Sequence, residues 1–198
     1  MRKTVLILGI ICLGMFPRFA FPAEAPANIF SDGYGPIEII IFSDYFCPPC
    51  QKIEPYLEEA LTKLHQSGAK ITLVDMPIHE MTPLFSRYFL YAANAADSFT
   101  QKLTVRRKLF DIAQSKAVDS EWALIQKLKE NQITLARLDV KPIFNEWLAL
   151  IKRFAVTSTP TCAVKQPGRE MITYSGGRDI STGIDQLLAG LSLNSSND

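Results

Sequence analysis

Apolar residues follow one another without alternation from Ile37 to Phe42, which is typical of a strand buried on both faces of a sheet. Beyond residue 47 the apolar positions recur every three or four residues as far as Gln66, and this spacing predicts an amphipathic helix. Residues 70–76 then form a second apolar run, which Pro77 closes. The first part of the chain therefore predicts a strand–helix–strand unit.

The rest of the chain changes pattern twice. Between residues 83 and 155 no strand-like run occurs, and the pattern favours helices, with Pro142 near the start of the last one or splitting it. Strand signals return at residues 161–164 and 171–174, and a final helix is expected over residues 180–191. The order predicts an α/β fold, β-α-β … β-β-α, with an inserted all-helical domain. The expected parts are two halves of the α/β fold, a helical insertion and a flexible tail, at residues 28–82 and 156–191, 83–155, and 192–198.

The N-terminal residues have the pattern of a secretory signal peptide. Arg2 and Lys3 precede an apolar run from Val5 to Phe16, and small residues at Ala25 and Ala27 follow. The run is shorter than the roughly 20 residues that span a bilayer, so cleavage is favoured over an uncleaved membrane anchor. Residues 1–27 are thus predicted to be removed, which indicates export to the periplasm, an oxidising compartment.

Composition is that of a globular protein, with 47% hydrophobic and 21% charged residues. The formal net charge of +1 argues against a nucleic-acid partner, which would demand a basic excess. Charge is uneven, because residues 83–155 carry 12 basic and 7 acidic side chains. Arg106, Arg107 and Lys108 are interpreted as part of a solvated basic helix face or of a surface for an acidic partner.

Cys47-Pro-Pro-Cys50 stands where the first strand meets the first helix. At the start of a helix, free backbone N–H groups and the helix dipole favour an anion such as a thiolate. Cys47 is therefore predicted to be a nucleophile, and Cys50, one turn further on, the thiol that resolves a mixed disulfide. The alternative is half of a zinc site, for which only Cys162, His65 and His79 remain, none in a paired spacing.

The segment FSDYFCPPCQKIEP resembles the active-site strand and helix of the thioredoxin superfamily, with Pro55 five residues beyond the second cysteine. Its aromatic-Ser-Asp lead-in, Phe42–Asp44, is similar to the DsbA-like branch, and residues 156–161 resemble the cis-proline loop of that family. The resemblance implies a thioredoxin fold with a helical insertion and dithiol–disulfide exchange with exported proteins that contain cysteines. It also implies a membrane redox partner that recharges the dithiol, and no bound cofactor or metal.

The resemblance also assigns roles outside the cysteines. It implies that Thr159-Pro160 is a cis peptide beside the nucleophilic sulfur, where the Thr159 backbone docks an extended substrate; the alternative is an ordinary trans bond. Thioredoxin-like proteins often carry a buried acid six residues before the first cysteine, but Ile41 stands there. Asp44 and Glu38 are the nearest acids, and each is interpreted either as a proton-transfer group acting through water or as a solvated surface acid.

The dipeptide between the cysteines predicts the strength of the oxidant. Pro48 suits the first turn of a helix, whereas Pro49 removes a backbone N–H that would otherwise point at the Cys47 sulfur. No histidine stands between the cysteines, in contrast to the strongly oxidising CPHC relatives. Fewer donors to the thiolate predict a weaker oxidant than those enzymes.

Other interpretations stay open at this level. Electrons can pass from the dithiol to substrate disulfides instead, as in a periplasmic reductase or isomerase for cytochrome c maturation or disulfide repair. Met76, His79 and Met81 form a loose group of soft ligands that, with the two cysteines, would suit a copper-handling binding protein. Cys162 is interpreted as a buried strand cysteine or as a third redox thiol. A monomer is expected, because the segment before the first strand is too short for a dimerisation domain.

Overall fold

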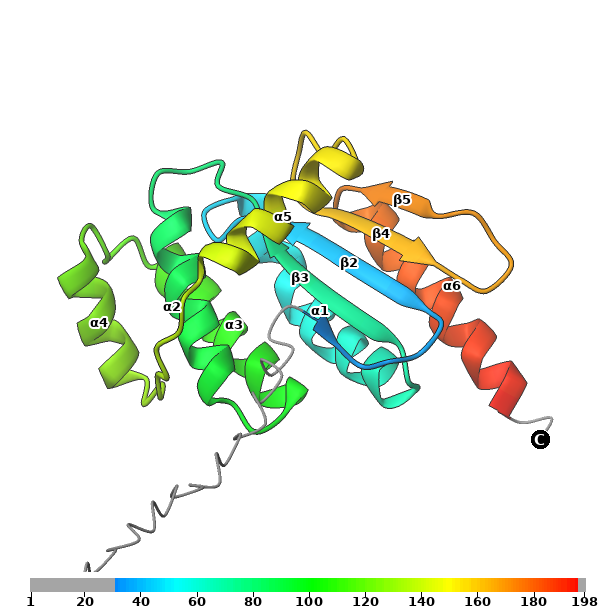
Figure 1. Ribbon diagram of the computed structural model, residues 1–198, viewed down its shortest axis with the longest axis horizontal. Helices are drawn as coiled ribbons and strands as arrows, with labels where there is room; N and C mark the ends of the chain where they lie inside the picture. The colour runs from blue at the N-terminus through cyan, green and yellow to red at the C-terminus, as the bar shows by residue number, and fades with distance from the viewer. Residues whose placement is uncertain (1–30, 196–198) are drawn as a thin grey trace, which may run out of the picture.

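A computed structural model describes residues 31–195 of the chain (Figure 1). Five strands and six helices occur in this part. In chain order they are β1 (Ser31–Asp32), β2 (Glu38–Ser43), α1 (Pro48–Gln66), β3 (Lys70–Asp75), α2 (Thr82–Ala95), α3 (Phe99–Gln114), α4 (Glu121–Glu130), α5 (Lys141–Arg153), β4 (Thr161–Lys165), β5 (Ile172–Ser175) and α6 (Gly177–Ser195). The predicted fold class is confirmed.

The strands form one mixed sheet in the order β1-β3-β2-β4-β5. Strand β2 lies at the centre, parallel to β3 and antiparallel to β4, with Ser43 opposite Asp75 and Ile41 opposite Cys162. Strand β1 has no counterpart in the sequence analysis, because two residues are too few to show a period. It pairs antiparallel with β3, and the Ser31 and Thr72 hydroxyls lie 2.7 Å apart there.

Helices cover both faces of the sheet, which explains the unbroken apolar run of β2. Figure 1 shows α1 and α6 behind the sheet and α5 crossing in front of β2 and β3. Ile39, Ile41 and Phe42 are fully buried. The Phe42 ring packs on Phe154, just beyond α5, with a centroid separation of 5.9 Å. Because β2 and β3 run parallel, their carboxyl ends meet at the same edge of the sheet.

Helices α2 to α5 make up the predicted helical block, and they share one hydrophobic core with the rest of the molecule. Pro142 falls in the first turn of α5 rather than splitting a longer helix. Helix α3 packs against both α1 and α2. The interpretation of Arg106 as part of a solvated face is wrong: this side chain is 1% exposed, because α3 turns it into the core.

The last helix is longer than predicted. Gly176, with φ of +83°, adopts the left-handed conformation that glycine tolerates, and α6 begins directly after it at Gly177. The helix continues past Leu191 to Ser195, so the expected flexible tail is helical for its first four residues. Leu188 and Leu191 pack against the core and extend the apolar stripe by another turn. Residues 196–198 lie outside the described part.

The predicted signal peptide, residues 1–27, also lies outside the described residues and stays a prediction. Within residues 31–195, no helix combines the length and the apolar character that crossing a bilayer requires.

Candidate active site

Cys47 stands at the amino end of α1, four residues beyond the last residue of β2. It is the N-cap residue, with φ of −78° and ψ of 115°, and its side chain caps no backbone N–H. Pro48 and Pro49 follow as the first helical residues, both exposed, and the Gln51 N–H donates to the Cys47 carbonyl over 3.0 Å. The sulfur is therefore free to face away from the helix while staying beside its amino end.

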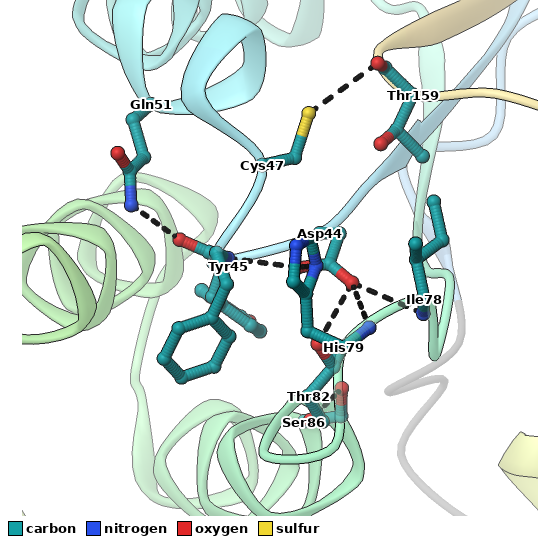
Figure 2. Close-up of polar contacts among 10 residues, drawn as sticks. Asp44, Tyr45, Cys47, Gln51, Ile78, His79, Thr82, Ser86 and Thr159 are labelled. Atoms are coloured by element: carbon teal, nitrogen blue, oxygen red, sulfur yellow. Dashed lines mark hydrogen bonds and ion pairs between the residues drawn. The ribbon is translucent and has the colours of Figure 1, made fainter.

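The loop before β4 lies against this sulfur. Cys47 Sγ donates to the Thr159 carbonyl oxygen over 3.4 Å, across 112 residues of sequence (Figure 2). The Thr159–Pro160 peptide bond is cis, as expected. Pro160 carries no N–H, whereas its carbonyl accepts from the Gly176 N–H at 2.9 Å. The structure thus brings together Cys47 and the Thr-Pro pair that the sequence analysis assigned to one site.

The three cysteines of the described chain are all free, and they differ in burial. Cys47 is 7% exposed, while Cys50 is 1% and Cys162 0% exposed. Burial raises the pKa of Cys50 well above its usual value; contact with Thr159 lowers it, and the neighbouring Cys47 raises it again. Burial also raises the pKa of Cys162 to about 12, so this residue is a protonated thiol inside β4. Cys50 is thus a protonated thiol one turn inside the helix, beneath Cys47.

Asp44, interpreted above as either a solvated acid or a proton-transfer group, is completely buried. Its Oδ1 accepts from the Phe46 N–H at 2.7 Å and pairs with His79 Nδ1 at 3.0 Å. Its Oδ2 accepts from the backbone N–H groups of Ile78 and His79, both at 3.1 Å, and from the Thr82 hydroxyl at 2.8 Å. The solvated interpretation is wrong, because the β3–α2 connection folds over the carboxylate and supplies most of these donors.

This carboxylate ties two segments together at one edge of the sheet. Phe46 and Cys47 follow Asp44 on one side, and the Cys47 N–H donates to the Asp44 carbonyl over 3.2 Å. On the other side the Phe46 ring lies 6.1 Å from the His79 ring. In Figure 2 the Asp44 carboxylate is directed at residues 78–82 and the Cys47 sulfur at Thr159. Asp44 therefore holds the loop that carries Cys47.

Glu38 lies elsewhere. It opens β2, whereas Cys47 follows the end of that strand, so roughly 16 Å of strand separates the two ends. Its carboxylate is 3.6 Å from Lys70 Nζ, and its side chain is 42% exposed. The structure does not bring Glu38 into the site, and of its two interpretations the surface acid fits this position.

A buried charged cluster that the sequence analysis missed lies beneath the cysteines. Arg106 Nε donates to Glu54 at 2.9 Å and its Nη1 donates to Asp75 at 3.0 Å, while Nη2 donates to the Ser43 hydroxyl. All three charged side chains are at least 95% buried. Glu54 stands four residues after Cys50 on the same face of α1, so the cluster begins one helical turn below the resolving thiol.

Two carboxylates share a single guanidinium in this cluster. Burial raises the pKa of Glu54 to about 7, although Arg106 lowers it, and the nearby Asp75 raises it further. Burial likewise raises the pKa of Asp75, against the opposing effect of Arg106. The only signal in the sequence was an acid at helical spacing within the apolar stripe of α1, between Ile53 and Leu57.

Met76, His79 and Met81, the three soft-ligand residues, differ in burial and in contacts. Met76 is buried at 8% exposure, Met81 is half-buried, and His79 engages Asp44 through Nδ1. Among residues 31–195, no three His, Cys, Asp or Glu side chains lie close enough together to hold a metal ion.

Comparisons with known proteins agree with this architecture. The thioredoxin family matches residues 34–180, which is most of the chain, and the chain belongs to this family. No curated protein matches the sequence.

Several solved structures share the fold. A periplasmic thioredoxin-like protein from Salmonella enterica serovar Typhimurium is 22% identical, with a TM-score of 0.57 over 82% of this chain and 92% of that one. A variant of Wolbachia pipientis α-DsbA1 is 12% identical, with a TM-score of 0.58 over 83% and 92%. The catalytic domain of Proteus mirabilis ScsC is 18% identical, with a TM-score of 0.56 over 80% and 88%. Because these sequence identities are low, the similarity to these structures shows a shared fold.

Three features define the class of this protein. They are the family match, the helical insertion, and the Cys47–Cys50 pair beside the Thr159–Pro160 loop. The chain is a DsbA-like thiol–disulfide oxidoreductase of the thioredoxin family.

Replacing Asp44 by asparagine tests the role of the buried carboxylate. Each oxygen of Asp44 accepts at least two hydrogen bonds, so an amide NH₂ in either place would face donors and leave them unpaired. We expect Asp44→Asn to lower the free energy of unfolding by about 3 kcal/mol. Urea denaturation of the reduced protein measures this loss.

Glu38→Gln is the matched control, since Glu38 is exposed and makes one long ion pair. Its free energy of unfolding should stay within about 0.5 kcal/mol of the parent. Equal stability of the two variants would contradict the role given to Asp44.

The raised pKa of Glu54 predicts how stability depends on pH. Its folded pKa is about 7 against an ordinary value of 4.5, so between these values the folded state keeps a proton that the unfolded state has lost. The free energy of unfolding should therefore fall as pH rises from about 4.5 to about 7, by at most about 3 kcal/mol from this group. Glu54→Gln should flatten that slope in urea denaturation at a series of pH values. An unchanged slope would show that Glu54 ionises alike in both states.

Proposed function

We propose that the protein is a periplasmic thiol–disulfide oxidoreductase that exchanges disulfides with exported proteins through its Cys-Pro-Pro-Cys dithiol. The observation that carries this proposal is the Cys47 sulfur at the amino end of α1, 3.4 Å from the Thr159 carbonyl oxygen. The signal-like residues 1–27 support export, as does the similarity to a periplasmic thioredoxin-like protein of Salmonella enterica.

The reaction proceeds by two thiolate attacks. In the oxidising direction a substrate thiolate attacks Cys47 Sγ of the Cys47–Cys50 disulfide, and Cys50 leaves as a thiolate that takes up a proton. A second substrate thiolate then attacks the substrate sulfur of the mixed disulfide, and Cys47 leaves. The substrate gains a disulfide and loses two electrons, which the enzyme keeps as its dithiol. A membrane redox partner then takes those electrons and restores the disulfide.

The different environments of the two cysteines fit this order of events. Cys47 is the more exposed of the pair and stands at the amino end of the helix, where an anion is favoured. Cys50 is buried with a raised pKa, so in the dithiol it stays protonated and does not compete for substrate. Thr159 offers its backbone beside Cys47, where an extended substrate segment would dock.

The dithiol is a weaker oxidant than those of CPHC enzymes. Pro49 supplies no N–H to Cys47, no histidine stands between the cysteines, and Cys47 does not cap the helix through its side chain. A reduced form with fewer donors to its thiolate is less stabilised, which lowers the tendency to accept electrons.

The reduction potential tests this strength. Equilibration with glutathione should give a value more reducing than the about −120 mV of DsbA. Pro49→His restores both a backbone N–H and a charge beside Cys47, and should move the potential in the oxidising direction. A parent value near −120 mV, or a histidine variant that is more reducing, would refute the assignment.

Trapping tests the reaction itself. Cys50→Ser removes the resolving thiol, so mixed disulfides between Cys47 and its substrates should accumulate as bands that disappear on reduction. Cys162→Ser is the matched control: this thiol is buried in β4, and no such bands are expected. Absence of bands with Cys50→Ser would refute the exchange reaction.

The redox state of the Cys47–Cys50 pair in cells decides whether the protein oxidises or reduces its substrates. A pair found mainly as disulfide by thiol labelling supports the oxidant, and a pair found mainly as dithiol supports the reductase or isomerase.

A further inference from the structure

The side chain of His79 lies against the loop that carries the reactive cysteine. Its Nδ1 is 3.0 Å from Asp44 Oδ1, although 35 residues separate the two in the sequence. The same carboxylate oxygen accepts from the Phe46 N–H at 2.7 Å, and the rings of Phe46 and His79 lie 6.1 Å apart. Figure 2 shows the imidazole beside the Asp44 carboxylate. Two separate contacts thus connect His79 to the residue directly before Cys47.

The Asp44 carboxylate decides which nitrogen of the ring can change its proton. An ionised carboxylate only accepts hydrogen bonds, so Nδ1 carries the hydrogen that faces Asp44. The other ring nitrogen, Nε2, is then the atom that gains or loses a proton. The His79 side chain is 45% exposed, so water reaches the ring. The pair carries one negative charge when the ring is neutral, and no net charge when the ring is protonated.

Few other charges lie around this pair. Glu80 follows His79 in the chain and is exposed, where water weakens the effect of its charge. Three segments that border the Cys47 loop have no charged side chain: they are residues 48–51, 82–86 and 156–160. The net charge of the Asp44–His79 pair is therefore what the Cys47 sulfur meets on this side of the loop.

Coulomb's law sets the size of the effect on Cys47. The contacts place His79 Nδ1 within about 13 Å of the Cys47 sulfur, because one backbone step adds at most about 3.8 Å. Over that distance a unit charge changes the population of a thiolate about twofold in water, and about tenfold at the effective dielectric constant near a protein surface. Histidine is the side chain whose charge ordinarily changes near neutral pH. The thiolate of Cys47 should therefore respond to pH through His79.

We propose that His79 is a positioning residue for the redox reaction, which in its protonated form neutralises Asp44 and favours the Cys47 thiolate. Its consequence for substrates rests on the proposed function. Oxidation of a substrate leaves the dithiol with a thiolate at Cys47, and a protonated His79 stabilises that product. The dithiol is then a stronger oxidant at acidic pH than the same dithiol without the histidine. The connection between β3 and α2 thus supplies a histidine that the Cys-Pro-Pro-Cys segment lacks.

Labelling of the reduced protein with iodoacetamide tests this charge without using disulfide exchange. The labelling rate follows the thiolate population, and mass spectrometry assigns the label to Cys47. His79→Gln is compared with the parent, because its amide still donates to Asp44 but takes up no charge. At about pH 5.5 and low ionic strength, we expect the parent to be labelled about threefold faster than His79→Gln. At about pH 8, where a histidine is ordinarily neutral, the two rates should be equal.

Two further variants make the test specific. His79→Arg has a permanent charge and keeps donors for the carboxylate, so it should be labelled about threefold faster than His79→Gln at both pH values. His65→Gln is the matched control, because the chain has two histidines and His65 stacks on Phe99 near the far end of α1. About 27 Å of helix separates it from Cys47, so its loss should leave both rates unchanged.

The pH profile distinguishes the charge of His79 from a merely structural role. A loss in His79→Gln of the same size at both pH values would show that the ring only holds the loop in place, and would overturn the proposal. Equal rates for the parent and His79→Gln at about pH 5.5 would overturn it as well.

Disulfide exchange with a dithiol peptide separates this inference from the proposed function. Exchange by the parent, together with labelling rates that His79→Gln does not change, would overturn the role of His79 and leave the proposed function standing. No exchange with any dithiol peptide would refute the proposed function, and the labelling rates would still decide whether the charge of His79 acts on Cys47.

Discussion

The buried carboxylate of Asp44 is the interaction on which the active edge of this molecule depends. A charge taken out of water is tolerated only when hydrogen bonds replace its hydration, and five donors surround this one. Because these donors come from two segments, satisfying the carboxylate fixes the Phe46–Cys47 loop against the connection after β3. The position of the reactive sulfur and the turn at His79 both follow from this constraint.

A second buried charge joins the helical block to the sheet. Arg106 comes from α3, Glu54 from α1 and Asp75 from the end of β3, so the cluster links three elements beneath the cysteines. Aromatic rings enclose it, with the guanidinium carbon 5.1 Å from the Phe110 ring centroid. Burial is the main reason why Glu54 holds its proton to higher pH than an ordinary acid, and the neighbouring carboxylate of Asp75 adds to this effect. The insertion is thus part of the core on which the redox site is built.

Ligand sites in open α/β sheets gather where the carboxyl ends of parallel strands meet, and this molecule follows that rule. Strand β2 leads to Cys47, and β3 leads to Asp75 and to the connection whose N–H groups bind Asp44. The redox site supplies reactivity with little selectivity, since a thiolate attacks any accessible disulfide.

The sequence by itself determined the elements and the chemistry. The apolar run of β2 and the helical spacing after Cys47 are local patterns with fixed periods, and the Cys-Pro-Pro-Cys and Thr-Pro pairs are motifs of adjacent residues. Only the tertiary structure decided which charges are buried. Asp44, Glu54 and Arg106 look like surface residues in the sequence, because burial depends on elements that arrive from distant parts of the chain. For the same physical reason the short β1, which exists only by pairing with β3, gives no signal in the sequence pattern.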